Sequence, residues 1–276
     1  MAYPRILTIQ DISCVGQCSL TVALPILSAC GVETAIIPSA VLSTHTAGFA
    51  GYTFRDLTED IPAIKDHWNK ENIKFSAVYT GYLGSTKQID YVANVMDETL
   101  LPEGKSFVDP AMADGGNLYP GFDDAYVAAM KTLCAKADYI LPNITEACYL
   151  TGTEYREKYD RAYIDHLISS LSSMGCKNII LTGVSYQEGR TGIEVVENGT
   201  RSYYEHEFLP NSCHGTGDIY ASSFVGAMMR GKDAFTSAKI AANYTVDCIR
   251  ATAKEENHWY GATFEPVIGN LIEYLK

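Results

Sequence analysis

Residues 75–110 read FSAVYTGYLGSTKQIDYVANVMDETLLPEGKSFVDP. The stretch contains two short apolar runs, Phe75–Thr80 and Lys105–Pro110, with the length and the β-branched and aromatic content of buried strands. Between them, Thr86–Leu100 has the apolar spacing of a helix. A strand, a helix and a second strand in this order predict a βαβ unit, whose two strands lie parallel in one sheet.

The same alternation extends along the chain on both sides of this unit. Four more short apolar runs read as strands: Arg5–Gln10, Glu33–Pro38, Asp138–Asn143 and Asn178–Gly183. Four more amphipathic segments read as helices: Gln17–Cys30, Ile61–Asn72, Asp123–Ala137 and Arg161–Met174. The pattern predicts an α/β fold with a mostly parallel central sheet covered by helices on both faces.

After Gly183 the pattern changes. Residues 192–207 hold two alternating stretches around Asn198-Gly199, which predicts an antiparallel hairpin. Three helical segments then complete the chain: Ile219–Arg230, Ala234–Ala253 and Phe264–Leu275. Because we find no linker, internal repeat or low-complexity segment, we expect residues 1–276 to form a single domain.

The composition argues against several classes of function. The chain has 276 residues, 47% of them hydrophobic, and a formal net charge of −12, which disfavours binding to nucleic acid or to anionic lipid. No apolar run approaches the roughly 20 residues that span a bilayer, and the first residues do not resemble a signal peptide. The eight cysteines are scattered without a CxxC pair. We therefore expect a cytoplasmic protein with reduced thiols.

Ligands of open parallel sheets bind beyond the carboxyl ends of the strands. The segments expected at that edge are rich in acids, small hydroxyls and glycines: Asp11, Ser43–Gly48, Gly81–Gly84, Asp109–Gly116, Asn143–Glu146, Thr182 and Cys213–Asp218. This mixture suits the transfer of a phosphoryl group.

The motif Gly215-Thr216-Gly217-Asp218 directly precedes an apolar helix. Glycines let the backbone approach a ligand closely, and the N–H groups at a helix start attract anions. Asp218 could accept the proton of an attacking hydroxyl, which is the usual role of a carboxylate base in phosphoryl transfer. The alternative is that Asp218 only caps the helix.

Acidic residues follow two neighbouring predicted strands. Asp109 and Asp114 come after one strand, and Asn143 and Glu146 come after the next. Clustered carboxylates beside a phosphate site can hold Mg²⁺, partly through water. Asn143 and Glu146 also have the spacing of a capping box, so both roles stay open.

Taken together, the motifs resemble the ribokinase superfamily in its pyridoxal/pyridoxamine kinase branch, along nearly the whole chain. The matching landmarks appear in the family's order: the Ile-Gln end of the first strand, Ser43-Thr44-His45-Thr46, Thr80-Gly81-Tyr82-Leu83-Gly84, Asp109-Pro110-Ala111-Met112-Ala113-Asp114-Gly115, Pro142-Asn143-x-x-Glu146-Ala147 and Gly215-Thr216-Gly217-Asp218. The resemblance implies a three-layer α/β/α sandwich, commonly a homodimer. It also implies ATP-dependent phosphorylation of the 5′-hydroxymethyl group of pyridoxamine, pyridoxine and pyridoxal, in the salvage of pyridoxal 5′-phosphate.

The resemblance further implies roles for single residues. Asp218 would be the general base, and Gly215, Thr216 and Gly217 would form the anion hole for the γ-phosphate. Asp109 and Glu146, as metal ligands, would organise Mg²⁺ with Asn143, while Asp114 and Thr182 would lie along the nucleotide. ATP and Mg²⁺ are the implied cofactors, and a monovalent cation such as K⁺ is a further candidate.

In the pyridine pocket, the resemblance places Thr46, His45 and Tyr82, with Tyr82 packing on the ring. The sequence departs from the family pattern at Asp11, where the pyridoxal kinases have a Ser that contacts the ring. A carboxylate there could pair with a protonated ring nitrogen or with an amine, so we hypothesise a preference for pyridoxamine or pyridoxine over pyridoxal. The alternative is that Asp11 caps the following segment.

Two further departures concern the phosphate side. Leu141 replaces the Thr that usually precedes Pro142, which removes one polar contact to the nucleotide. His214 stands before Gly-Thr-Gly, as in the hydroxymethylpyrimidine kinase branch, and we count it with the substrate-binding residues.

Three alternatives to a vitamin B6 kinase follow. Hydroxymethylpyrimidine kinase, of thiamine metabolism, is the nearest, because His214 favours it while Asp218 and the Asp109–Gly115 segment favour the B6 branch. A dinucleotide-dependent oxidoreductase needs G-x-G-x-x-G after the first strand, and residues 11–20 lack it. A non-catalytic vitamer-binding protein would not need the intact set of base, anion hole and metal acids.

Overall fold

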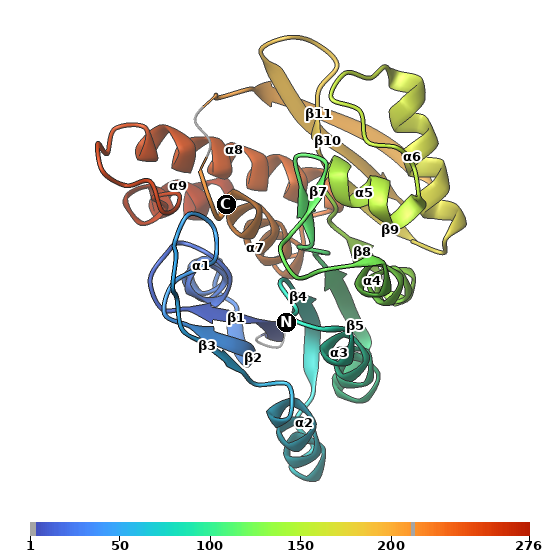
Figure 1. Ribbon diagram of the computed structural model, residues 1–276, viewed down its shortest axis with the longest axis vertical. Helices are drawn as coiled ribbons and strands as arrows, with labels where there is room; N and C mark the ends of the chain where they lie inside the picture. The colour runs from blue at the N-terminus through green and yellow to red at the C-terminus, as the bar shows by residue number, and fades with distance from the viewer. Residues whose placement is uncertain (1–3, 211–212) are drawn as a thin grey trace.

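The computed structural model describes residues 4–210 and 213–276. Within these residues, nine strands form one sheet in the order β11-β10-β9-β8-β5-β4-β1-β2-β3 (Figure 1). Their bounds are β1 Arg5–Ser13, β2 Glu33–Leu42, β3 Phe54–Asp56, β4 Phe75–Thr80, β5 Leu100–Val108, β8 Tyr139–Ile140, β9 Asn178–Val184, β10 Arg190–Glu197 and β11 Thr200–Glu207.

The sheet is parallel through its centre and antiparallel at both edges. The six strands from β9 to β2 pair in parallel, while β10 and β11 at one edge and β3 at the other pair antiparallel. The predicted hairpin is confirmed, and both of its turn residues have positive φ, 50° at Asn198 and 77° at Gly199. This is the backbone of the two-residue turn that suits the twist of paired strands.

Two layers of helices cover the sheet. Five helices share one apolar core with it: α2 Asp60–Lys70, α3 Thr86–Thr99, α4 Asp124–Lys136, α5 Ile144–Thr151 and α6 Arg161–Ser173. Four share the other: α1 Leu20–Ala29, α7 Thr216–Met229, α8 Ala234–Thr252 and α9 Ile268–Tyr274.

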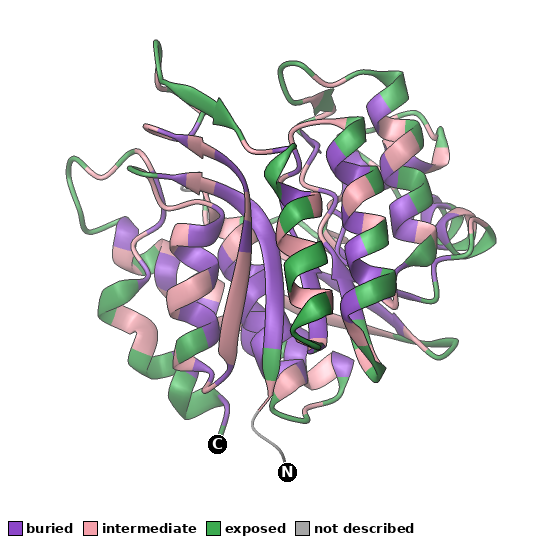
Figure 2. Cartoon of the chain, turned by 90° about the horizontal axis from the view of Figure 1, so that it is seen from below, coloured by how far each residue is buried: buried purple, intermediate pink, exposed green. Residues whose placement is uncertain are grey.

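Side chains along each strand alternate between these two cores, as the pleat requires. On β4, for example, Val78 joins the first core, and Ala77 and Tyr79 join the second. Figure 2 shows the buried sheet between helices whose outer sides are exposed. The predicted α/β/α sandwich is confirmed.

Some element bounds differ from the prediction. Asp11 was expected after the first strand, but it lies inside β1, where the pairing with β2 is irregular between Gln10 and Ile12. Strand β8 has only two residues, because Pro142 soon follows and cannot donate to a strand partner. The last predicted helix begins as a 3-10 turn, Glu265–Val267, before α9.

Three short strands were not predicted: β3, and the two-residue strands β6 (Ala113–Asp114) and β7 (Asn117–Leu118), which pair with each other. Among the described residues, no helix combines the length and apolar character needed to cross a membrane.

Candidate active site

Acidic residues from β1, from the segments that follow β5 and β8, and from the first turn of α7 gather at the carboxyl edge of the parallel strands. At this edge, after the effect of burial, the charge of Asp11 raises the pKa of Asp218, and the charge of Asp218 raises the pKa of Asp109. The sheet therefore brings together acids that are distant in the sequence, as expected for segments at the carboxyl ends of parallel strands.

Helix α7 begins with an open turn. Gly215 is its first flanking residue, with φ of 79°, and within the described residues no side chain caps the helix. A Cβ at Gly215 would lie 1.7 Å from the Gln17 backbone oxygen, so only glycine fits there. The first intrahelical bond runs from the Ile219 N–H to the Gly215 carbonyl (3.0 Å), which leaves the preceding N–H groups outside the ladder.

Space lies open in front of this turn. Apart from its two chain neighbours and the nearby backbone of α7 itself, no heavy atom of the described residues lies within 4 Å of the position that a Cβ would take at Gly217. The Thr216 hydroxyl donates back to the Cys213 carbonyl (3.3 Å), which holds the turn together. The start of α7 therefore offers backbone N–H groups and the positive end of the helix dipole to an anion.

Asp218 lies in the first turn of α7, and the alternative in which it caps the helix is wrong. Its carboxylate accepts the backbone N–H of Ser19 instead. Burial, together with a smaller effect from the charge of Asp11, raises the pKa of Asp218 to about 7 against the opposing effect of the Ser19 N–H. A carboxyl group with a pKa near neutrality can both accept and release a proton under ordinary conditions.

Asn143 and Glu146 form the capping box of α5, so the capping interpretation is confirmed. The Asn143 amide oxygen accepts the Glu146 N–H (2.9 Å), and the Glu146 carboxylate accepts the Asn143 N–H (2.9 Å). The second Glu146 oxygen accepts the Met112 N–H (3.0 Å), and the Asn143 amide also donates to the Ala113 carbonyl (2.8 Å). These bonds fix the Glu146 carboxylate at the end of the loop that follows β5.

Asp109 and Glu146 are two carboxyl groups with little water around them. Burial raises the pKa of Asp109 well above its usual range, and the charges of Glu146 and Asp218 raise it further. Burial also raises the pKa of Glu146 to about 7, although backbone N–H groups oppose the shift. Like charges that repel each other in a buried place are stabilised by a cation.

Asp114 and Thr182 lie near this pair: the charge of Asp114 contributes to the raised pKa of Glu146, after burial, and Thr182 forms a β-bridge with Asn143. Asp114 is exposed and its carboxylate accepts the Gly115 N–H (2.8 Å). Thr182, on β9, donates its backbone N–H to the Pro142 carbonyl (2.9 Å), which ties β9 to the start of α5.

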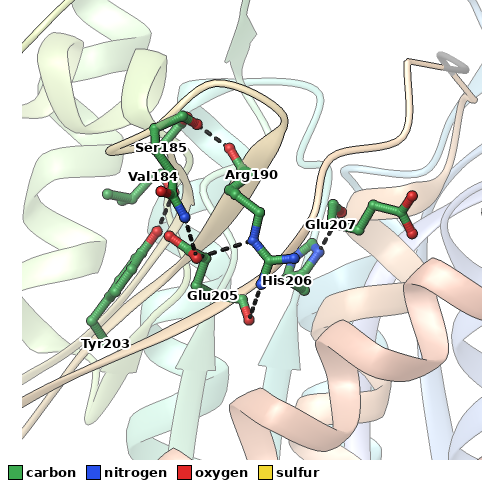
Figure 3. Close-up of polar contacts among 8 residues, drawn as sticks. Val184, Ser185, Arg190, Tyr203, Glu205, His206 and Glu207 are labelled. Carbon is green, nitrogen blue, oxygen red and sulfur yellow. Dashed lines mark hydrogen bonds and ion pairs between the residues drawn. The ribbon is translucent and has the colours of Figure 1, made fainter.

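The loop after β9 is held to the hairpin, as Figure 3 shows. Arg190 donates to the Glu205 carboxylate (3.0 Å), and the Ser185 hydroxyl donates to the Arg190 carbonyl (2.7 Å). The Tyr203 hydroxyl donates to the Val184 carbonyl (3.1 Å). These contacts fix the end of the strand that carries Thr182.

Asp11 is buried at the other side of the crevice. Its carboxylate accepts the Ser13 hydroxyl (2.9 Å) and a hydrogen bond from Ser19, and it does not cap a helix. Burial raises the pKa of Asp11, and these two bonds oppose the shift. Tyr82 is half-buried, with its ring stacked on Phe122 at 5.5 Å, and burial together with the charge of Asp11 raises its pKa to about 12.

His45 joins two loops. Its Nδ1 accepts the Ala47 N–H (3.2 Å), so its Nε2 carries the proton and donates to the Tyr260 carbonyl (2.5 Å). The His214 ring lies 5.3 Å from the His45 ring, and burial, then His45, lowers the pKa of His214. Because both nitrogens of His45 are already bonded, His45 can contact a ligand only through its ring face or edge. Thr46, on the same loop, is exposed.

Two contributors to this site were not predicted. Ser19 supplies the N–H that holds Asp218, and no sequence motif marks it. Tyr119 lies within the electrostatic reach of four acids, and burial followed by the charges of Glu146, Asp114, Asp109 and Asp218 raises its pKa. The only sequence signal for Tyr119 was its place in the loop after Asp114-Gly115-Gly116.

A cavity of about 310 Å³ opens beside the loop that leads to α7. The residues that line it are Cys213, Thr252, Ala253, Glu255, Glu256, His258 and Trp259, so none of the acids described above faces it.

Comparison with known proteins gives a consistent picture. The family model described as phosphomethylpyrimidine kinase matches residues 26–263. A crystal structure with pyridoxal, of a protein from Bacteroides thetaiotaomicron described as a candidate phosphomethylpyrimidine kinase, is 34% identical, with a TM-score of 0.91 over 98% of this chain and 96% of that one.

Two pyridoxal kinase structures are also similar. The pyridoxal kinase of Lactobacillus plantarum is 30% identical, with a TM-score of 0.90 over 99% of this chain and 98% of that one. The pyridoxal kinase of Leishmania donovani, in complex with ADP and pyridoxamine, is 20% identical, with a TM-score of 0.83 over 97% of this chain and 95% of that one. At this identity the similarity shows a shared fold.

Proposed function

Because this chain belongs to the phosphomethylpyrimidine kinase family, we propose that it transfers the γ-phosphate of ATP to the 5′-hydroxymethyl group of vitamin B6 vitamers. The resemblance to the pyridoxal kinase branch of the ribokinase superfamily is confirmed by neighbours at 30% identity or more. The chain is a kinase, and the residue roles that follow are our proposal.

The open start of α7 is the observation that carries the proposal. Asp218 lies in the first turn of a helix whose leading N–H groups have no side-chain cap among the described residues. We assign Asp218 as the general base that takes the proton of the 5′-hydroxyl. The oxygen then attacks the γ-phosphorus and ADP leaves, while the N–H groups of Gly215, Thr216 and Gly217 stabilise the charge on the transferring group.

Mg²⁺ fits the pair Asp109 and Glu146, whose raised pKa values reflect burial and, for Asp109, the charge of Glu146. Within residues 4–210 and 213–276, no group of three or more His, Cys, Asp or Glu side chains is arranged to hold a metal directly. We therefore assign the two carboxylates, with Asn143 beside them, to a hydrated ion, since Mg²⁺ usually keeps several waters and binds few carboxylates. The ion would neutralise the charge of the triphosphate.

ATP as the phosphoryl donor is supported by the ADP bound to the Leishmania donovani enzyme. We assign Asp114 and Thr182 to the nucleotide side, because Asp114 acts on Glu146 and Thr182 pairs with Asn143. The requirement for a monovalent cation such as K⁺ stays a prediction.

The vitamer would lie against Asp11, Tyr82, His45, Thr46 and His214. Pyridoxal and pyridoxamine, bound to two of the similar structures, support a pyridine ring in this place. Asp11 is nearly enclosed, at 4% exposure, and its raised pKa would return towards the usual range beside a protonated ring nitrogen or an amine. Tyr82, already stacked on Phe122, would pack on the ring.

We also propose a cytoplasmic homodimer in which residues 1–276 act as one catalytic domain. The edge strand β3 is exposed: Phe54, its first residue, is 49% exposed, and Tyr52 just before it is 39% exposed. Exposed apolar side chains on an unpaired strand edge favour contact with a second copy. Light scattering after size exclusion would give the mass of a dimer, and a monomer mass at working concentration would reject this part.

A coupled assay tests the activity. With Mg²⁺-ATP, we expect ADP release in the presence of pyridoxamine, pyridoxine or pyridoxal, and little with ribose. Turnover restricted to ribose, or none with any acceptor, would reject the proposal. A non-catalytic vitamer-binding protein would bind the vitamers without releasing ADP.

Hydroxymethylpyrimidine is the second candidate acceptor. It is favoured by His214 before the Gly-Thr-Gly turn and by the name of the matching family model. The same assay decides, because a kcat/KM for hydroxymethylpyrimidine above that of all three vitamers would make it the substrate.

A further inference from the structure

A group of polar side chains lies in the core directly below the candidate site. Gln10 on β1, Tyr79 on β4 and Ser222 on α7 are each 0% exposed. Tyr79 belongs to the core on the side of α1 and α7, so its ring points towards the helix that carries Asp218. Polar side chains are uncommon in a core made otherwise of Ile, Leu, Val, Ala and aromatic residues.

These side chains have unused hydrogen-bonding atoms. The Tyr79 hydroxyl, the Gln10 Oε1 and the Ser222 hydroxyl are buried and have no hydrogen-bond partner among the described residues. The Gln10 amide nitrogen donates to the Thr8 hydroxyl (2.8 Å), which fixes the direction of Oε1. Ser222 and Gln10 lie beside the phenol, and hydrogen bonding from both lowers its pKa against the larger effect of burial, although neither contact has the full geometry of a hydrogen bond. Groups that are this close but poorly bonded to one another suit a shared third partner.

The same group is next to the two central acids. Ser222 is four residues after Asp218, so both lie on one face of α7. Tyr79 pairs with Phe107, and Asp109 is two residues further on, towards the same side of the sheet. The charges of Asp109 and Asp218 both raise the pKa of Tyr79, after burial, which agrees with this arrangement on one side of the sheet.

We propose that Tyr79 is a positioning residue whose hydroxyl, together with Ser222 and Gln10, holds one enclosed water molecule beneath Asp218. Such a water accepts from the two hydroxyls and donates to Gln10 Oε1 and to the carboxylate, which uses its four hydrogen bonds. It holds Asp218 towards the substrate from the side opposite to the Ser19 N–H. The role of Tyr79 in turnover rests on the proposed kinase activity.

Removal of a single hydroxyl tests the kinetic role. In Tyr79→Phe, kcat should fall roughly 10-fold or more, as expected when a charged group loses a supporting hydrogen bond, while KM for ATP and vitamer and the melting temperature are unchanged. Tyr220→Phe is the matched control, because the Tyr220 hydroxyl is also buried and unpartnered on α7, but only burial shifts its pKa. Equal effects of the two variants, or a parallel change in KM and melting temperature, would overturn the proposal.

A double variant tests whether Tyr79 acts through Asp218. If it does, Tyr79→Phe causes no further loss in the Asp218→Asn background. A further 10-fold loss there would mean that Tyr79 acts independently, which contradicts the proposal.

A structural measurement needs no turnover. A high-resolution crystal structure should contain a water within hydrogen-bond distance of Tyr79, Gln10, Ser222 and Asp218, and Tyr79→Phe should displace or lose it. A structure with no water there would overturn the proposal even in an active kinase. An inactive wild-type protein that holds the water would reject the proposed function and keep the site.

Discussion

Two helices begin at the carboxyl edge of the sheet, and their first turns are built in opposite ways. Helix α5 starts with a complete capping box, in which Asn143 and Glu146 satisfy each other's backbone N–H groups. Helix α7 starts at Gly215 with no side-chain cap among the described residues. The α5 turn is closed by its own side chains, and the α7 turn is open.

The difference suits the two helix starts to different roles. A capped start cannot offer its N–H groups to a ligand, so α5 serves to fix a carboxylate, Glu146, beside Asp109. An uncapped start gives up the roughly 0.5–2 kcal/mol that a cap contributes and keeps its N–H groups for an anion. We therefore assign the metal to the α5 side and the transferring phosphoryl group to the α7 side.

The largest effect is expected from the base on the open side. Asp218→Asn should lower kcat/KM by roughly 10²–10⁴-fold, the usual contribution of a general base, and leave ADP affinity unchanged. Asp124→Asn is the control, because Asp124 is an exposed acid in the first turn of α4. Near-normal turnover in Asp218→Asn would mean that another group is the base.

The pH dependence of the wild-type enzyme follows from the same carboxyl group. The pKa of Asp218 is raised to about 7, and only the ionised form can accept a proton. As the pH falls below 7, kcat/KM should therefore drop about 10-fold per unit. A profile that is flat between pH 5 and 8 would disagree with this assignment.

Two glycine substitutions distinguish folding from binding at the open turn. In Gly215→Ala, the new Cβ meets the Gln17 oxygen at 1.7 Å and the positive φ is strained, so both melting temperature and turnover should fall. In Gly217→Ala, the new Cβ meets no other part of the described chain, so the melting temperature should hold while KM for ATP rises. If Gly217→Ala binds ATP normally, the anion does not approach this turn.

Asp11→Ser sharpens the comparison on the substrate side. Loss of a charged partner should lower kcat/KM for pyridoxamine relative to pyridoxal by roughly 10-fold, since a hydrogen bond to a charged group contributes about 1.5–3 kcal/mol. The three vitamers are compared in both proteins under one set of conditions. An unchanged ranking would reject the hypothesis that Asp11 sets the preference.

The smallest effect is expected on the closed side. Asn143→Ala removes the cap of α5 and should cost about 1 kcal/mol, or roughly 2–4 °C in melting temperature for a chain of this size. Thr216→Ala at the start of α7 removes no cap and should shift the melting temperature less. Calorimetry of both variants checks this, and equal shifts would contradict the distinction.

The fold could be predicted from periodicity because most of the parallel strands are short, apolar and separated by amphipathic helices. The irregularity in β1 could not, since a shift in pairing between Gln10 and Ile12 leaves no mark in the sequence, and it moved Asp11 from a loop into a strand. Strand β3 was missed because all three of its residues are exposed, so it has no buried side to give a pattern.

In the candidate site, too, local features could be predicted from the sequence and long-range contacts could not. The Asn143–Glu146 box could be recognised because both of its residues act within one local segment, whereas the role of Asp218 stays a prediction. The bond from His45 to the Tyr260 carbonyl and the Ser19 N–H on Asp218 join residues far apart in the chain, so only the folded structure reveals them. Tyr79 had the appearance of an ordinary core residue in a β-strand.

The most direct measurement is a crystal structure with ADP, Mg²⁺, pyridoxamine and aluminium fluoride as a mimic of the transferring phosphoryl group. We predict that the mimic contacts the N–H groups of Thr216 and Gly217, and that the vitamer hydroxymethyl oxygen lies roughly 2.6–3.2 Å from the Asp218 carboxylate. A mimic bound at the start of α5, or a hydroxymethyl group directed away from Asp218, would contradict the account.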